Sequence, residues 1–158
     1  MYILNVKLSQ SKKFFTVFLI ISVILAIMCV VGLEKSLNGD KNTATCDEIG
    51  EYSLKIKSDS EIEDFLSKFG VKADISDIKR EKVIIPHQFN QIYEDYNRLQ
   101  KKIGLDLAKF KGKQAEKLTI AVDSDQADFA VLLLSDSKVI GGHLTTLEYG
   151  GKNLSLMG

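Results

Sequence analysis

The residues best suited to chemistry are Tyr93, Tyr96, Asn97 and Gln100, which lie at intervals of three and four residues. This spacing places side chains on one face of a helix. Phenol and amide groups donate and accept hydrogen bonds, so such a face can line a groove and bind a ligand or a partner. The same groups can also belong to a core, with the hydroxyls at its rim and Gln100 bonded to backbone. We favour the core and keep the four residues as the candidate binding set.

Metal chemistry has little support in the sequence. The only histidines are His87 and His143, and Cys46 is the only cysteine beyond the apolar N-terminal run. A zinc site needs three or four ligands at suitable spacings, and these residues do not provide them. The aspartates at 123, 125 and 128 resemble a calcium loop but lack its central glycine and its final glutamate. We therefore expect no metal site and no cofactor.

Catalysis is no better supported. No serine stands in a Gly-x-Ser-x-Gly elbow, and neither Gly141-Gly142 nor Gly150-Gly151 lies in a phosphate-binding pattern. We therefore assign no catalytic residue and favour a protein that is not an enzyme.

Six lysines cluster near residue 110 and could contact anionic lipid or an anionic wall polymer, although a solvated loop is favoured. They are Lys101, Lys102, Lys109, Lys111, Lys113 and Lys117.

Charge and hydropathy divide the chain. Residues 14–33 are twenty residues without a charge, long enough to cross a bilayer as a helix, and Lys7, Lys12 and Lys13 precede them. The positive-inside rule then predicts a cytoplasmic tail (1–13), a transmembrane anchor (14–33), a tether (34–50) and an extracytoplasmic domain (51–158) in the cell membrane. A cleaved signal peptide is the main alternative. From Cys46 onward, 16 basic and 19 acidic residues argue against nucleic-acid binding.

The periodicity of the outer domain predicts an α+β fold. Apolar residues at helical spacing predict a short helix over 60–69 and a second over 88–103, each ended by a glycine. Strands are predicted at 52–56, 71–75, 82–85, 118–122, 129–134 and 139–142, with possible edge strands at 147–149 and 154–156. We expect an antiparallel sheet with both helices packed on one face, preceded by the transmembrane helix.

From Ile85 onward the sequence resembles a bacterial extracytoplasmic family of domains of unknown function, DUF4830. The residues that carry this resemblance are Ile85, Pro86, Phe89, Tyr93, Tyr96, Asn97, Gln100, Gly104, Asp106, Leu107, Lys111-Gly112-Lys113 and Val139-Ile140-Gly141-Gly142. The family often has an acidic residue after the paired glycines, where this chain has His143. The resemblance implies a domain boundary and no activity.

Together these observations predict a membrane-anchored, non-enzymatic module that binds an envelope protein or another envelope component. Two alternatives remain open: an envelope hydrolase without a recognisable motif, and a carrier of a lipid or another small ligand with a pocket under the second helix. A closed core between helix and sheet favours the first function, and an open cleft with converging carboxylates favours the hydrolase.

Overall fold

The computed structural model describes residues 20–24, 28, 42–147 and 152–157. The chain forms two compact units, Met1–Lys41 and Asn42–Gly158. In the first unit, residues 20–24 and 28 are helical. Most of the predicted transmembrane segment, 14–33, lies outside the described residues. Within the described ranges, no helix has the length and apolar character needed to span a membrane.

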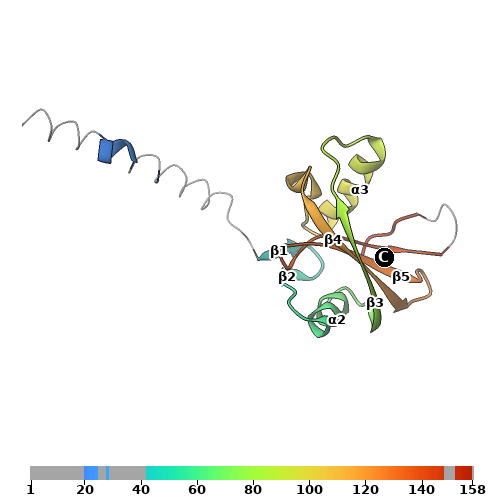
Figure 1. The fold of residues 1–158 in the computed structure, drawn as a ribbon. Helices are drawn as coiled ribbons and strands as arrows, with labels where there is room; N and C mark the ends of the chain where they lie inside the picture. The colour runs from blue at the N-terminus through green and yellow to red at the C-terminus, as the bar shows by residue number, and fades with distance from the viewer. Residues whose placement is uncertain (1–19, 25–27, 29–41, 148–151, 158) are drawn as a thin grey trace, which may run out of the picture. The chain divides into compact units, whose positions relative to one another are not determined.

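The second unit is built on a four-stranded antiparallel sheet in the order β3-β4-β5-β6 (Figure 1). The strands are β3 (Lys72–Ile84), β4 (Gln114–Asp123), β5 (Phe129–Ser135) and β6 (Lys138–Thr145). Strand β3 replaces the two short strands predicted at 71–75 and 82–85, because only a bulge between Asp74 and Lys79 interrupts its pairing with β4. Of the predicted edge strands, Leu154 forms an isolated bridge with Leu144, and Tyr149 lies outside the described residues.

Two helices and one 3-10 turn accompany the sheet: α2 (Asp59–Ser67), α3 (Gln91–Lys102) and η1 (Leu107–Phe110). Both predicted helices are thus confirmed within a few residues at each end. Gly70 and Gly104, which follow them, have φ of 72° and 75°. Glycine adopts this left-handed conformation without steric cost, which explains why the helices end where the sequence predicts.

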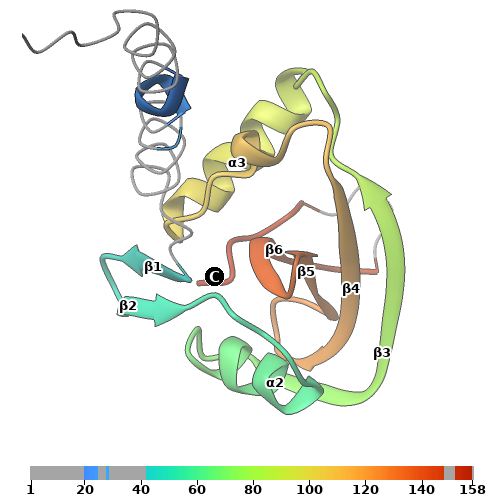
Figure 2. The same cartoon turned by 60° about the vertical axis from the view of Figure 1, so that its left-hand side comes forward.

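The helices pack on opposite faces of the sheet, which corrects the prediction that both lie on one face. The buried α2 residue Phe65 clusters with Leu132, whereas Tyr96 of α3 packs against the cluster that contains Leu133. Leu132 and Leu133 are neighbours on β5, so their side chains point to opposite faces. Figures 1 and 2 show the two helices far apart with the strands between them. A continuous apolar strand such as β5 needs a cover on each face, because both sets of its side chains are apolar.

A separate two-stranded sheet joins β1 (Thr43–Cys46) to β2 (Gly50–Ser53). The tether predicted over 34–50 therefore contains a strand and part of a second, and the folded unit begins at Asn42. The strand predicted at 52–56 overlaps β2 at residues 52 and 53. Strand β1 was not predicted, because Asn42, Thr43 and Thr45 are polar or turn-forming residues. Tyr52 on β2 is buried, and its hydroxyl donates a hydrogen bond to the carbonyl of Ile103 at the end of α3.

Candidate functional site

Helix α3 carries all four residues of the candidate binding set. Its first turn is capped by Asn90, whose side-chain oxygen accepts a hydrogen bond from the Tyr93 backbone N–H at 3.0 Å. Such a cap satisfies one of the N–H groups that a helix leaves unpaired at its start. The capped start and the glycine stop at Gly104 fix the length of α3, and thereby the positions of the four side chains.

Gln100 binds the sheet. Its side chain is fully buried, and Oε1 accepts a hydrogen bond from the backbone N–H of Gly142 at 2.7 Å. Gln100 therefore bonds backbone outside its own helix, as predicted. A Cβ at Gly141 would lie 3.4 Å from Oε1, an ordinary contact, whereas a Cβ at Gly142 would lie 2.8 Å from Leu156 Cδ1 and 3.0 Å from Leu132 Cδ2. Gln100 Nε2 is buried with no hydrogen-bond partner among the described residues.

The Asn97 side chain also makes its hydrogen bonds within the domain. Its Oδ1 accepts a hydrogen bond from the Leu107 N–H at 2.8 Å, and its Nδ2 donates to Asp106 Oδ1 at 3.0 Å. Burial opposes ionisation of Asp106, but hydrogen bonds from Asn97 and Ala108 and the charges of Lys101 and Lys109 outweigh it and lower the pKa of the carboxyl. Asn97 therefore ties α3 to the start of η1 and makes no contact that a ligand would share.

Tyr96 faces the sheet and pairs with His143 on β6. The hydroxyl oxygen lies 2.9 Å from His143 Nδ1, and the two rings pack edge to face at 5.2 Å between centroids. Burial, and secondarily the charge of Lys117, lowers the pKa of His143 to about 4. The imidazole is therefore neutral at pH 7. The Tyr96–His143 pair is the one polar contact of the four predicted residues that borders an open space.

That open space is a cleft between α3 and the face of the sheet that carries Leu133, and its volume is about 730 Å³. Its apolar lining comes from the end of β3 and the segment after it, from α3 and β5, and from the start of η1. The apolar residues are Val83, Ile84, Ile85, Pro86, Ile92, Tyr93, Tyr96, Leu99, Leu107, Val131 and Leu133. Its polar lining is Asp95, Lys117, His143, Lys152 and Asn153. We call this space the α3 cleft.

Exposed apolar side chains gather at the rim of the α3 cleft. In the described part of the folded unit, four large hydrophobic residues are more than a third exposed: Ile84 (69%), Ile92 (74%), Tyr93 (36%) and Leu147 (76%). Three of these four line the cleft, and only Leu147 does not. Grouped exposed apolar residues mark binding surfaces more often than scattered ones do. Of the predicted set, the structure therefore brings Tyr93 and Tyr96 to the cleft and places Asn97 and Gln100 in the core.

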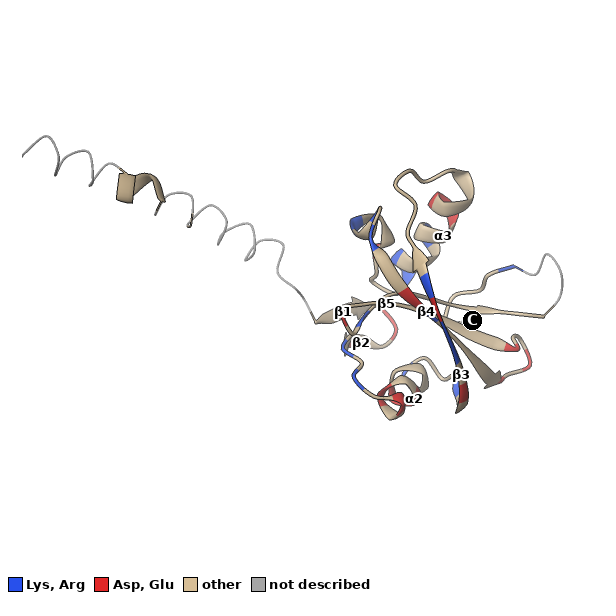
Figure 3. Ribbon diagram, viewed as in Figure 1, with Lys and Arg blue, Asp and Glu red and all other residues tan. Residues whose placement is uncertain are grey.

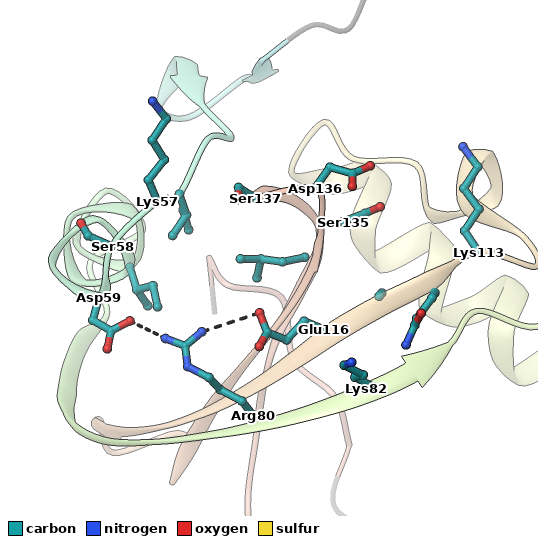
Figure 4. A pocket seen from close by; sticks show the side chains of 15 residues that line it. Lys57, Ser58, Asp59, Arg80, Lys82, Lys113, Glu116, Ser135, Asp136 and Ser137 are labelled. Carbon is teal, nitrogen blue, oxygen red and sulfur yellow. Dashed lines mark hydrogen bonds and ion pairs between the residues drawn. The ribbon is translucent and has the colours of Figure 1, made fainter.

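A second cleft, of about 690 Å³, is polar and lies between α2 and the opposite face of the sheet. Figure 4 shows the Arg80 guanidinium between Asp59 of α2 and Glu116 of β4. It pairs with both carboxylates, at 3.7 Å from Glu116. The two carboxylates balance the charge of the guanidinium and leave one negative charge, and the pair with Asp59 connects α2 to the sheet.

The lysine cluster predicted near residue 110 is spread over several contacts. Lys111 lies 3.9 Å from Glu94 and above the Phe89 ring, and Lys117 pairs with Glu81 at 2.5 Å. Figure 3 shows basic and acidic residues mixed along β3 and around α3. This mixture favours solvated ion pairs over one basic surface.

Other catalytic candidates are not brought together. Cys46 is buried, with its Sγ 3.2 Å from Met157 Sδ. Among the described residues, no group of three potential ligands is placed to hold a metal ion. His143 and Lys117 line the α3 cleft, although neither was predicted as a binding residue. A period-two count along β6 could have found His143, because it shares a face with Gly141.

The comparisons with known proteins give a family and nothing finer. No curated protein and no solved structure matches the chain. A family model described as "Domain of unknown function (DUF4830)" matches residues 65–144, which include most of the main sheet and all of α3. The match covers 80 of 158 residues and includes the positions on which the resemblance was based. The chain therefore belongs to the DUF4830 family.

Proposed function

We propose that this protein is a membrane-anchored binding module whose folded unit lies outside the cytoplasm and binds an envelope component in the α3 cleft. The observation that carries the proposal is a grouping around one partly buried polar pair, Tyr96–His143. Three of the four exposed large hydrophobic residues in the described part of the folded unit line the same cleft as this pair. Ligand sites are mostly apolar, with a few polar groups that fix orientation. The α3 cleft has this composition.

The proposed anchor rests on the sequence. Residues 14–33 carry no charge, and the lysines before them place the N-terminus in the cytoplasm by the positive-inside rule. With the folded unit beginning at Asn42, the proposed tether shortens to residues 34–41. A reporter that is active only in the cytoplasm, fused after Gly158, tests this topology and should be silent. A strong signal would reverse the proposed orientation.

Binding without catalysis agrees with the chemistry of the cleft. Among the described residues, its polar lining offers one carboxylate, Asp95, whereas hydrolases use a pair of carboxylates for acid-base chemistry. The neutral imidazole of His143 is engaged by the Tyr96 hydroxyl. These groups are suited to orienting a bound molecule by hydrogen bonds.

The test is position-specific crosslinking in the native membrane. A photoreactive amino acid at Ile92, on the rim of the cleft, should give an adduct of defined mass. The matched control is the same substitution at Leu147, which is equally exposed but does not line the cleft. An adduct at Ile92 alone supports the proposal, and equal labelling at both positions, or none, contradicts it.

A further inference from the structure

The size of the α3 cleft indicates what kind of molecule it takes. Its volume of about 730 Å³ lies within the range of roughly 300–1,000 Å³ found for small-molecule sites. A stable protein partner would instead cover roughly 800 Å² of surface on this side, over some 20 residues or more. The cleft has 16 lining residues, and three of them, Ile85, Leu107 and Leu133, are buried. A small ligand therefore fits it better than a protein surface does.

The apolar lining of the cleft is suited to a ligand with an aliphatic chain. Eleven of its 16 lining residues are apolar or aromatic, and they come from both sides of the space. Ile84 and Ile92 are 69% and 74% exposed at the rim, so an aliphatic chain lying between them would remove apolar surface from water on both partners.

The polar part of the cleft, at His143 and Lys152, is suited to a negatively charged group that accepts hydrogen bonds. His143 lines the cleft, and its Nδ1 lies 2.9 Å from the Tyr96 hydroxyl oxygen. When the hydroxyl donates to Nδ1, the neutral ring carries its proton on Nε2 and can donate it to a ligand. The imidazole and the phenol then form a short donor chain that ends in the cleft.

The charges of the lining leave a net positive balance. Asp95 is paired with Arg98, and Lys117 is paired with Glu81. Lys152 also lines the cleft, and it has no carboxylate partner in the parts of the chain that the structure describes. An anionic head group near Lys152 and His143 would give Lys152 a partner of opposite charge.

We infer that the α3 cleft binds a single-chain amphiphile, with its aliphatic chain between Ile84 and Ile92 and its anionic head group at His143 and Lys152. The inference rests on the proposed function for the location of the site and adds the chemical class of the ligand. A free fatty acid and a lysophospholipid share this chemistry, and the experiment below includes both.

The experiment uses the full chain in nanodiscs of phosphatidylcholine. The probe is a dodecanoate that carries a photoreactive diazirine, and mass spectrometry locates its adducts. Labelling should saturate and map to residues that line the cleft. Unlabelled dodecanoate should compete better than dodecanol, which has the same chain without the charge, by about three-fold, as one exposed ion pair allows. Competition by lysophosphatidylglycerol distinguishes a lipid source from a free acid.

Two variants separate the chain from the head group. Ile92→Glu should weaken labelling at least about ten-fold, because it places a charge where the chain lies. Leu147→Glu makes the same change at an exposed site outside the cleft and should have no effect. Lys152→Gln should remove the preference for dodecanoate over dodecanol while labelling persists. All three residues are exposed, so an unchanged thermal midpoint checks that each variant is folded.

Unsaturable labelling, equal loss in Leu147→Glu, or equal competition by dodecanoate and dodecanol would overturn the inference. The crosslinker at Ile92 keeps this failure distinct from that of the proposed function. If it captures a protein while dodecanoate does not label the cleft, binding at the cleft stands and the ligand class is wrong. If both experiments are negative, both proposals fail.

Discussion

Replacing Gly104 by alanine should separate the cost of a left-handed backbone from the cost of a steric clash. Gly104 has φ of 75°, and a Cβ there would lie 2.3 Å from the carbonyl oxygen of Thr45. Alanine at positive φ costs roughly 1–2 kcal/mol, partly offset by the lower entropy of the unfolded chain. The clash is with backbone, so its relief requires β1 or α3 to shift, at roughly 1–3 kcal/mol. We expect Gly104→Ala to lower the free energy of unfolding by about 2–4 kcal/mol.

Gly70→Ala is the matched control. Gly70 has nearly the same φ, 72°, also follows a helix, and has nothing within 4 Å of the position that a Cβ would take. Its replacement should cost only about 1 kcal/mol, from the backbone alone. Urea unfolding of residues 42–158, followed by circular dichroism, gives both values, provided that the slope with denaturant is unchanged. Equal losses for the two variants would refute the reasoning, because the hairpin would then not hold the end of α3 through Thr45.

Three further predictions test the core and the folded unit. Residues 42–158 alone should show one cooperative thermal transition, and its absence would mean that the unit needs its anchor or a partner. Asn97→Leu should lower the free energy of unfolding by about 1–3 kcal/mol in urea titrations, whereas Gln100→Leu should cost less, because it also removes a buried donor that has no partner among the described residues. The pKa of His143 falls from 6.5 to about 4 on folding, so the unfolded chain binds more protons in that interval. The free energy of unfolding should therefore fall by up to about 3 kcal/mol as the pH drops from 6.5 to 4, measured as the difference between the parent and His143→Gln.

The sequence was most informative at positions where the residue type allows only one local structure. A glutamine in the middle of an apolar helix face must bond backbone, and Gln100 does so at Gly142. Glycines after two amphipathic stretches predicted the ends of α2 and α3, and both have positive φ. These predictions depend on local geometry and on the cost of an unpaired buried group, which a single sequence displays directly.

The arrangement of the helices could not be predicted in the same way. The run Phe129–Leu134 is apolar at odd and even positions, which shows that both faces of β5 are covered but does not say by which segment. Strand β1 and its pairing with β2 were missed for a different reason. Its residues 42–45 are polar or small, and only Ala44, Cys46 and Tyr52 are buried. Its docking depends on contacts with α3 that are more than fifty residues away in sequence.

The two buried amides explain how α3 can serve both the core and the cleft. Asn97 binds η1 and Gln100 binds β6, so the rotation of the helix about its axis is fixed at two points one turn apart. Tyr96 and Ile92 lie four residues apart on the adjoining strip of the same helix, and that rotation directs both toward the cleft. A site held by buried hydrogen bonds on a rigid element loses little freedom when a ligand binds. The amides therefore position the cleft wall while the side chains beside them make the contacts, which is why one helical face could be interpreted both as a core and as a binding surface.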